Sequence, residues 1–220
     1  MHRLAAIMQR DTVVMTLASF TLIACSVARG GEKRESMTRI EFSFEADLLR
    51  SARPKTIYVA GDRYARIEEF ADATSGVKNL IVVSEPDIWL VDAVRKTVGH
   101  AVNHETDPTV HNPILGPDGP EELFALEYGR EVSFFEEANA SRLAAEELYG
   151  KRCDVREIIV AEYRLRLYVD PHRRTPIAMK AFKDGELLFG LRYSNYQTDL
   201  PFDLSIFRPP KGLTLIEASE

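Results

Sequence analysis

The chain has 220 residues, of which 45% are hydrophobic, and its formal net charge is −6 at pH 7. This size suits one sizeable folded domain behind a leader segment. The acidic balance argues against nucleic acid as a partner, because neutralising phosphate groups requires basic patches.

The first 24 residues have the layout of a secretory signal peptide. Arg3 and Arg10 precede an uncharged apolar run at residues 12–24. This run is shorter than the ~20 residues that a bilayer-spanning helix needs. Removing residues 1–24 takes away two arginines and one aspartate, so the net charge goes from −6 to −7. We therefore expect export to the bacterial cell envelope.

Residues 22–25, LIAC, resemble a bacterial lipobox, in which the cysteine is acylated and becomes the first mature residue. Lipidation of Cys25 would make residues 25–37 a polar tether. In the lipoprotein-sorting systems that this leader resembles, an aspartate after the cysteine holds the lipoprotein at the inner membrane. This chain has Ser26 at that position, so we expect the mature protein at the periplasmic face of the outer membrane. The alternative is ordinary cleavage after Ala28, which leaves a soluble periplasmic protein. With Cys25 acylated, Cys153 has no disulfide partner and is predicted to be a small core residue.

Period-two alternation of apolar and polar residues dominates residues 38–220 and predicts β-strands. In residues 40–48 the apolar side chains share one face. Gly61-Asp62 is predicted to be a two-residue hairpin turn, and Glu85-Pro86-Asp87 a turn in the next hairpin. Such short connections favour antiparallel pairing, because parallel strands need long crossovers.

Residues 104–150 interrupt the alternation. A Pro/Gly-rich loop is followed by a predicted helix that starts at Pro120 and stops at Gly129. The segment REVSFFEEANA is either a second short helix or a strand around Phe134 and Phe135. We expect a helical insert around residues 116–140.

The predicted fold class is mainly β with a few short helices: a curled antiparallel sheet, a half-open β-barrel of about ten or eleven strands, with a helical lid. An extensive sheet with few helices to cover it must curl on itself, and the helices then plug the opening. The interior becomes a hydrophobic cavity unless side chains fill it completely. The predicted ligand-lining residues are Ile40, Phe42, Phe44, Leu48, Trp89, Leu123, Phe124 and Leu126.

The C-terminal part carries a resemblance to a known family. A strand closes on Asp170-Pro171, Pro176 opens the next strand, and Tyr193 and Tyr196 lie on a long strand. Phe207, Pro209, Pro210 and Gly212 follow, and Trp89 lies in a hairpin of the family's type. Over residues 38–216 this order resembles the outer-membrane lipoprotein carrier and receptor superfamily of the LolA/LolB type, and especially its uncharacterised relatives.

The resemblance implies a curled antiparallel sheet with a helical lid that holds acyl chains of lipids or lipoproteins. It also implies a membrane-anchored or periplasmic protein with a possible envelope protein partner. Carriers of this type begin with a helix before the first strand, whereas residues 26–37 here are polar.

Motifs for catalysis and cofactors are not found. His100, His104 and His111 are the one cluster that suggests a metal, but residues 100 and 104 on one strand would lie about 13 Å apart at ~3.3 Å per residue. No nucleophile elbow or phosphate-binding glycine loop is present. Arg173 and Arg174 lie in a predicted turn, where they either meet an anionic headgroup or partner or are simply solvated.

The sequence therefore predicts a non-enzymatic hydrophobic-ligand binding protein of the lipoprotein-localisation type, without metal or cofactor. The alternative is an envelope sensor or assembly scaffold lipoprotein that uses the same fold without a ligand.

Overall fold

The computed structural model describes residues 36–45, 55–69, 79–105, 110–114 and 123–216. Within these residues the chain forms one twelve-stranded sheet with one α-helix, α1 (Glu131–Glu137), and one 3-10 helix, η3 (Leu204–Phe207). The strands are β1 (Ser36–Phe44), β2 (Lys55–Ala60), β3 (Tyr64–Glu69), β4 (Asn79–Ser84), β5 (Asp87–Asp92), β6 (Thr97–Val102), β7 (Ser141–Leu148), β8 (Lys151–Val160), β9 (Tyr163–Val169), β10 (Pro176–Lys183), β11 (Glu186–Pro201) and β12 (Thr214–Ile216).

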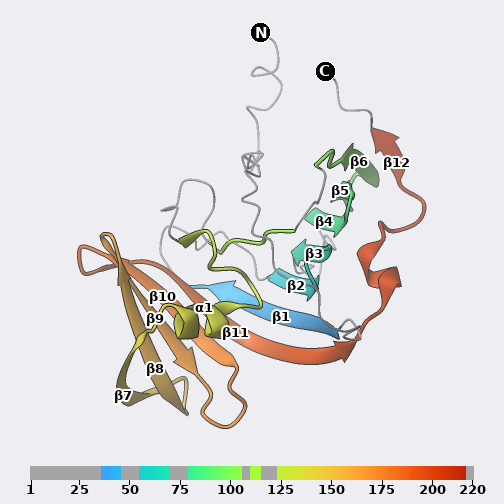
Figure 1. Cartoon of the computed structure of the whole chain (residues 1–220). Coiled ribbons are helices and arrows are strands. Elements are labelled where there is room, and N and C mark those ends of the chain that lie inside the picture. Colours follow the sequence, from blue (N-terminus) through green and yellow to red (C-terminus); the bar gives the residue numbers. More distant parts are fainter. Residues whose placement is uncertain (1–35, 46–54, 70–78, 106–109, 115–122, 217–220) are drawn as a thin grey trace, which may run out of the picture.

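The sheet is curled but not closed. Its strand order is β12-β6-β5-β4-β3-β2-β1-β11-β10-β9-β8-β7, so β12 and β7 are the two edges. In Figure 1 β1 and β11 join the two sides of a trough: β2–β6 rise to the upper right, β7–β10 lie at the lower left, and α1 lies beside β8–β11. This confirms the predicted fold class, a mainly β half-open barrel with a helical lid.

Short turns join most neighbouring strands, and these strands pair antiparallel. Asp184 and Gly185 both have positive φ, 52° and 86°, as a type I′ hairpin turn requires. The turn after β2 has three residues, Gly61–Arg63, one more than predicted. β12 instead pairs in parallel with β6, because the chain reaches it by a long connection from β11.

The convex face of β1–β6 is covered by the C-terminal segment. Phe207 of η3 is fully buried against Met37 and Ala60. The Nη1 of Arg66 on β3 donates a hydrogen bond of 2.9 Å to the carbonyl oxygen of Ile206. Farther along, Leu213 packs on the buried cluster Leu80, Val82, Val91 and Val98. The convex side of this half of the sheet therefore has its own core, separate from the concave side.

Only the second of the two expected helices is present as an α-helix among the described residues. α1 begins after Arg130 and ends before Asn139, whose φ of 52° is left-handed. Of the predicted helix at residues 120–128, Leu123 is 3-10 helical, with the Leu126 N–H donating to its carbonyl at 3.0 Å, whereas residues 124–128 are not helical. There the Ile114 N–H donates to the carbonyl of Leu126, and the Tyr128 N–H donates to that of Asn112. These tertiary hydrogen bonds replace the ones that a helix would have made.

Several predictions lie outside the described residues, among them the signal peptide and lipidation at Cys25. Leu48 also falls outside them. The first strand begins at Ser36, within the segment predicted as tether. Among the described residues no helix has the length and apolarity to cross a membrane.

Candidate functional site

The concave face is filled by side chains where α1 covers it. Phe135 of α1 and the preceding loop residues Leu123 and Leu126 are fully buried. They pack in one cluster with Ile40 and Phe42 of β1 and with apolar residues of β8–β11. The ring of Phe42 stacks on that of Tyr128, with centroids 4.9 Å apart. This half of the trough is a packed core.

A buried carboxylate fastens α1 to the sheet. Glu131, the first residue of α1, is fully buried and accepts hydrogen bonds from two tyrosine hydroxyls of β11. Tyr193 donates to Oε1 at 3.1 Å and Tyr196 to Oε2 at 2.7 Å, and the backbone N–H of Gly129 also donates to Oε2 at 3.1 Å. Buried polar groups need such partners, because an unpaired one keeps its full desolvation cost.

The same burial changes how these groups titrate. Desolvation raises the pKa of Glu131 above its usual value, against the lowering effect of the hydrogen bonds that it accepts. Desolvation, and then the proximity of Glu131, raise the pKa values of Tyr193 and Tyr196 well above their usual range. The tyrosines therefore remain hydroxyl donors at physiological pH.

One row of apolar side chains crosses the sheet from the packed half into the open half. The strand register places Ile40 opposite Ile57, Ile57 opposite Ile67, Ile67 opposite Ile81, and Ile81 opposite Leu90. Side chains directly opposite each other share a face. Ile40 and Ile57 belong to the core around α1, so the whole row lies on the concave face.

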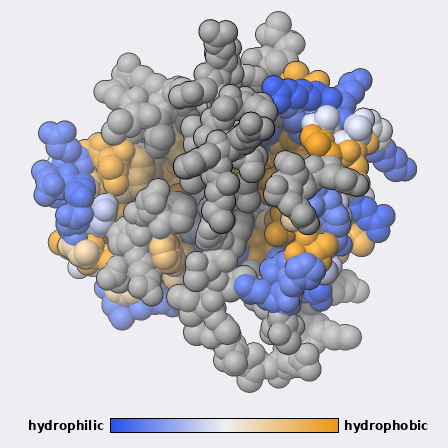
Figure 2. Space-filling model, turned by 90° about the horizontal axis from the view of Figure 1, so that it is seen from above, coloured by the Kyte–Doolittle hydropathy of each residue, from blue (hydrophilic) through white to orange (hydrophobic). Residues whose placement is uncertain are grey.

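Exposure rises along this row with distance from α1. Ile40 and Ile57 are 0% and 1% exposed, Ile67 and Ile81 are half-buried, and Leu90 is 41% exposed. In the next row, Ile88 of β5 is half-buried and Ala101 of β6 is exposed. In the view from above, hydrophobic residues lie inward of hydrophilic ones at the left and at the right of the molecule (Figure 2). We call Ile67, Ile81, Ile88 and Leu90 the concave apolar patch.

Four of the predicted lining residues come together: Ile40, Phe42, Leu123 and Leu126 are buried in the same cluster. Phe44 packs against this cluster, and Phe124 is half-buried.

Sequence reasoning missed the concave apolar patch and Glu131. Alternation marked the strands of the patch, but the choice of face depends on register. The sequence resemblance pointed to Tyr193 and Tyr196, but it did not reveal that both donate hydrogen bonds to Glu131.

Trp89 lies on the other face of the sheet. It is opposite Val82 in the register and packs against the convex cluster of Leu80, Val82, Val91 and Val98. Its ring stacks on His100 at 5.5 Å, and the His100 Nε2 lies 2.8 Å from Asp87 Oδ1. The convex core thus accounts for the contacts of this tryptophan.

The histidines of the predicted loop have separate neighbours. His111 Nδ1 lies 2.5 Å from Glu127 Oε1, and His104 is exposed. No three His, Cys, Asp or Glu side chains within the described parts of the chain are grouped so that they could hold a metal ion. Cys153 is fully buried, as predicted, and burial raises the pKa of its thiol.

The curled open sheet with α1 inside it is the architecture that the sequence resemblance predicted. No family model matches the chain, and no curated protein matches its sequence.

Solved structures similar to this chain include the following three. One is a LolA superfamily protein from Nitrosomonas europaea (12% identity, 81% of this chain and 92% of that one, TM-score 0.33). Another is a putative outer membrane lipoprotein-sorting protein domain from Vibrio parahaemolyticus (14% identity, 79% and 88%, TM-score 0.37). A third is the MucA/MucB complex of Pseudomonas aeruginosa (12% identity, 83% and 59%, TM-score 0.41). These likenesses concern the fold alone.

Proposed function

We propose that the chain is a non-enzymatic binding protein of the bacterial cell envelope that holds a hydrophobic ligand in its trough. The observation that carries this proposal is the continuous apolar row from Ile57 to Leu90, which becomes exposed away from α1. An acyl chain of a lipid or lipoprotein suits such a surface, since each buried methylene contributes about 0.8 kcal/mol. Binding of the acyl chain requires no hydrogen bonds or ion pairs from the protein.

The proposed subcellular location depends on the leader segment. Residues 1–24 would direct export, and acylation of Cys25 would hold the mature protein at the periplasmic face of the outer membrane. Without acylation the protein would be free in the periplasm. In both cases its ligands are those of the envelope, and partners would be lipoproteins or other envelope proteins.

The test is ligand binding by the purified protein. Native mass spectrometry of protein from a diderm host is expected to find co-purified lipid, and a fluorescent fatty acid is expected to bind. Leu90→Glu places a charge in the concave apolar patch and is expected to weaken that binding by about tenfold or more. Because Leu90 is 41% exposed, the fold tolerates the change.

Ile159→Glu is the matched control. Ile159 is 72% exposed. Its neighbour on β8, Ile158, has its side chain in the concave core, and because successive side chains of a strand point to opposite faces, Ile159 lies on the convex face. This variant is expected to bind the probe like the unmodified protein. An unmodified protein that is empty and does not bind the fatty acid would contradict the proposal, and so would equal effects of the two variants.

The packed half of the trough favours a second function, an envelope sensor or assembly scaffold. Phe135, Leu123 and Leu126 already fill the space over β1 and β8–β11, so this half has no need of a ligand. A protein that excludes every lipid probe but retains its fold would fit this function better than the first.

A further inference from the structure

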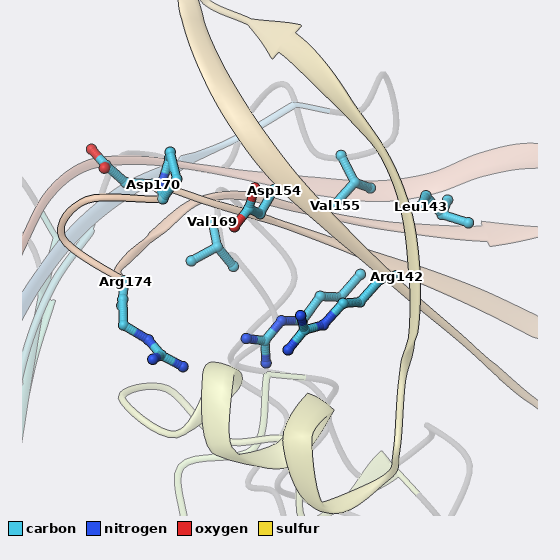
Figure 3. A pocket seen from close by; sticks show the side chains of 9 residues that line it. Arg142, Leu143, Asp154, Val155, Val169, Asp170 and Arg174 are labelled. Atoms are coloured by element: carbon cyan, nitrogen blue, oxygen red, sulfur yellow. The ribbon is translucent and has the colours of Figure 1, made fainter.

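Three arginines from three elements line one cavity at the β7 edge of the sheet. Arg142 lies on β7, Arg156 on β8, and Arg174 in the turn between β9 and β10. The cavity has a volume of about 280 Å³. Figure 3 shows the side chains of Arg142 and Arg174 extending toward α1. A neighbouring cavity of about 250 Å³ is lined by Arg142 and Arg156 and by Phe135 and Glu136 of α1.

Two of these arginines face each other directly across a strand pair. The register of β7 and β8 places Arg142 opposite Arg156. Like charges in this position destabilise a sheet unless an opposite charge lies between them. The facing arginines Arg142 and Arg156 therefore do not stabilise the sheet, but they are well placed to bind an anion together.

The protein supplies one carboxylate to this cluster. Glu136 Oε1 accepts hydrogen bonds from Arg156 Nη1 at 3.0 Å and from Arg174 Nη2 at 3.1 Å. The hydrogen bond from Arg156 contributes most to lowering the pKa of Glu136. Among the ion pairs and hydrogen bonds between described residues, none involves the Arg142 side chain. Glu136 is 47% exposed, and ion pairs this exposed are weak.

Two further acidic residues, Asp154 and Asp170, line the cavity, so that with Glu136 the three arginines have three carboxylates around them. Asp170 Oδ1 accepts the backbone N–H groups of His172 and Arg173, and its carboxylate points away from the arginines in Figure 3. This turn also places Arg174, whose N–H donates to the Asp170 carbonyl at 2.8 Å. Asp154 lines the cavity and opposes an anion. With the Asp170 carboxylate turned away, two carboxylates, those of Glu136 and Asp154, remain beside the three guanidinium groups.

We propose that Arg142, Arg156 and Arg174 form a binding site for a phosphate-type oxyanion. Guanidinium groups recognise phosphate through paired N–H donors, and each of these arginines has donors that Glu136 does not occupy. The cavity of about 280 Å³ has room for a phosphate group. That group comes either from a lipid headgroup or from a free phosphate.

Two probes distinguish these sources. Inorganic phosphate is titrated into the purified protein at low salt and followed by calorimetry. Vesicles of phosphatidylcholine, with and without phosphatidic acid, are tested by co-sedimentation. Binding of the vesicles alone indicates a headgroup, and binding of inorganic phosphate alone indicates a free phosphate. Either result, or both, supports the site, and binding is expected to fall with added salt.

Two variants change the affinity in opposite directions. Arg142→Ala removes a guanidinium group that has no partner among the described residues and is expected to weaken binding by about three- to tenfold, with Arg142→Lys in between. Glu136→Gln removes the competing carboxylate and is expected to strengthen binding by about threefold. Arg95→Ala is the control, since Arg95 lies in the β5–β6 turn and is 83% exposed.

A purely structural cluster gives a different pattern. Binding of neither probe by the folded protein would overturn the proposal. So would unchanged affinity in Arg142→Ala, an equal loss in Arg95→Ala, or weaker binding in Glu136→Gln. Circular dichroism of each variant confirms the fold. The test does not depend on the fatty-acid probe, so this site and the concave apolar patch can fail separately.

Discussion

Tyr196 of β11 and Glu131 of α1, 65 residues apart in the chain, are joined by a hydrogen bond of 2.7 Å from the tyrosine hydroxyl to Oε2. Together with the bond from Tyr193, it fixes the only α-helix of the described residues inside the trough. The position of this helix decides which half of the concave face is filled and which remains exposed.

The first prediction concerns the pH dependence of stability. Burial raises the pKa of Glu131 in the folded state above 4.5, so the folded protein binds this proton more tightly than the unfolded chain does. The resulting stabilisation is fully present below the unfolded pKa and is lost as pH rises through the folded pKa. Glu131→Gln cannot titrate, so its stability relative to the unmodified protein is expected to increase with pH over this window.

Urea unfolding at a series of pH values measures this difference. Glu137→Gln is the control, because Glu137 lies on the same helix but is exposed. Its stability difference from the unmodified protein is expected to vary little with pH. A Glu131→Gln curve parallel to that of the unmodified protein would show that Glu131 titrates normally.

The second prediction concerns the C-terminal segment on the convex face. Phe207 is fully buried against β1–β3, with its ring 5.3 Å from that of Tyr64. Phe207→Ala leaves a cavity and is expected to lower the free energy of unfolding by about 3–5 kcal/mol. Leu204→Ala, in the same 3-10 helix but 39% exposed, is expected to cost less than about 1 kcal/mol. Denaturant unfolding compares the two, and similar losses would argue against this packing.

The third prediction concerns the reactivity of Cys153. The thiol is fully buried and donates weakly to the Lys151 carbonyl at 3.4 Å, and burial raises its pKa. Since the thiolate is the reactive form, Ellman's reagent is expected to react slowly with the native protein and rapidly in denaturant. The measurement uses a Cys25→Ala variant, so that one thiol remains. Rapid, complete reaction without denaturant would indicate that β8 opens readily.

The fourth prediction concerns the membrane anchor. If Cys25 is acylated, Cys25→Ala is expected to move the protein from the membrane fraction to the soluble fraction of a diderm host. Stable anchoring requires more than one acyl chain, as a single chain binds membranes only reversibly. Cys153→Ala serves as the control and is expected to stay in the membrane fraction. The same fractionation for Cys25→Ala and the unmodified protein would mean ordinary leader cleavage.

Local sequence patterns were enough to predict the fold class and most of the strands. Alternation such as that of residues 40–44 identifies a half-buried strand because successive side chains point to opposite faces. Turn residues such as Asp184 and Gly185 mark where the chain reverses, because they accept positive φ. These signals are local, so a single sequence reveals them.

Which apolar face of a strand packs against which partner became clear from the three-dimensional structure. Trp89 and Leu90 are adjacent, yet one packs in the convex core and the other is exposed on the concave face. Hydrogen bonds to residues 112 and 114 replace the predicted helix over residues 124–128, and Glu131 contacts tyrosines more than 60 residues away in the chain. Register and long-range hydrogen bonds depend on how the whole sheet curls, and no local pattern encodes that geometry.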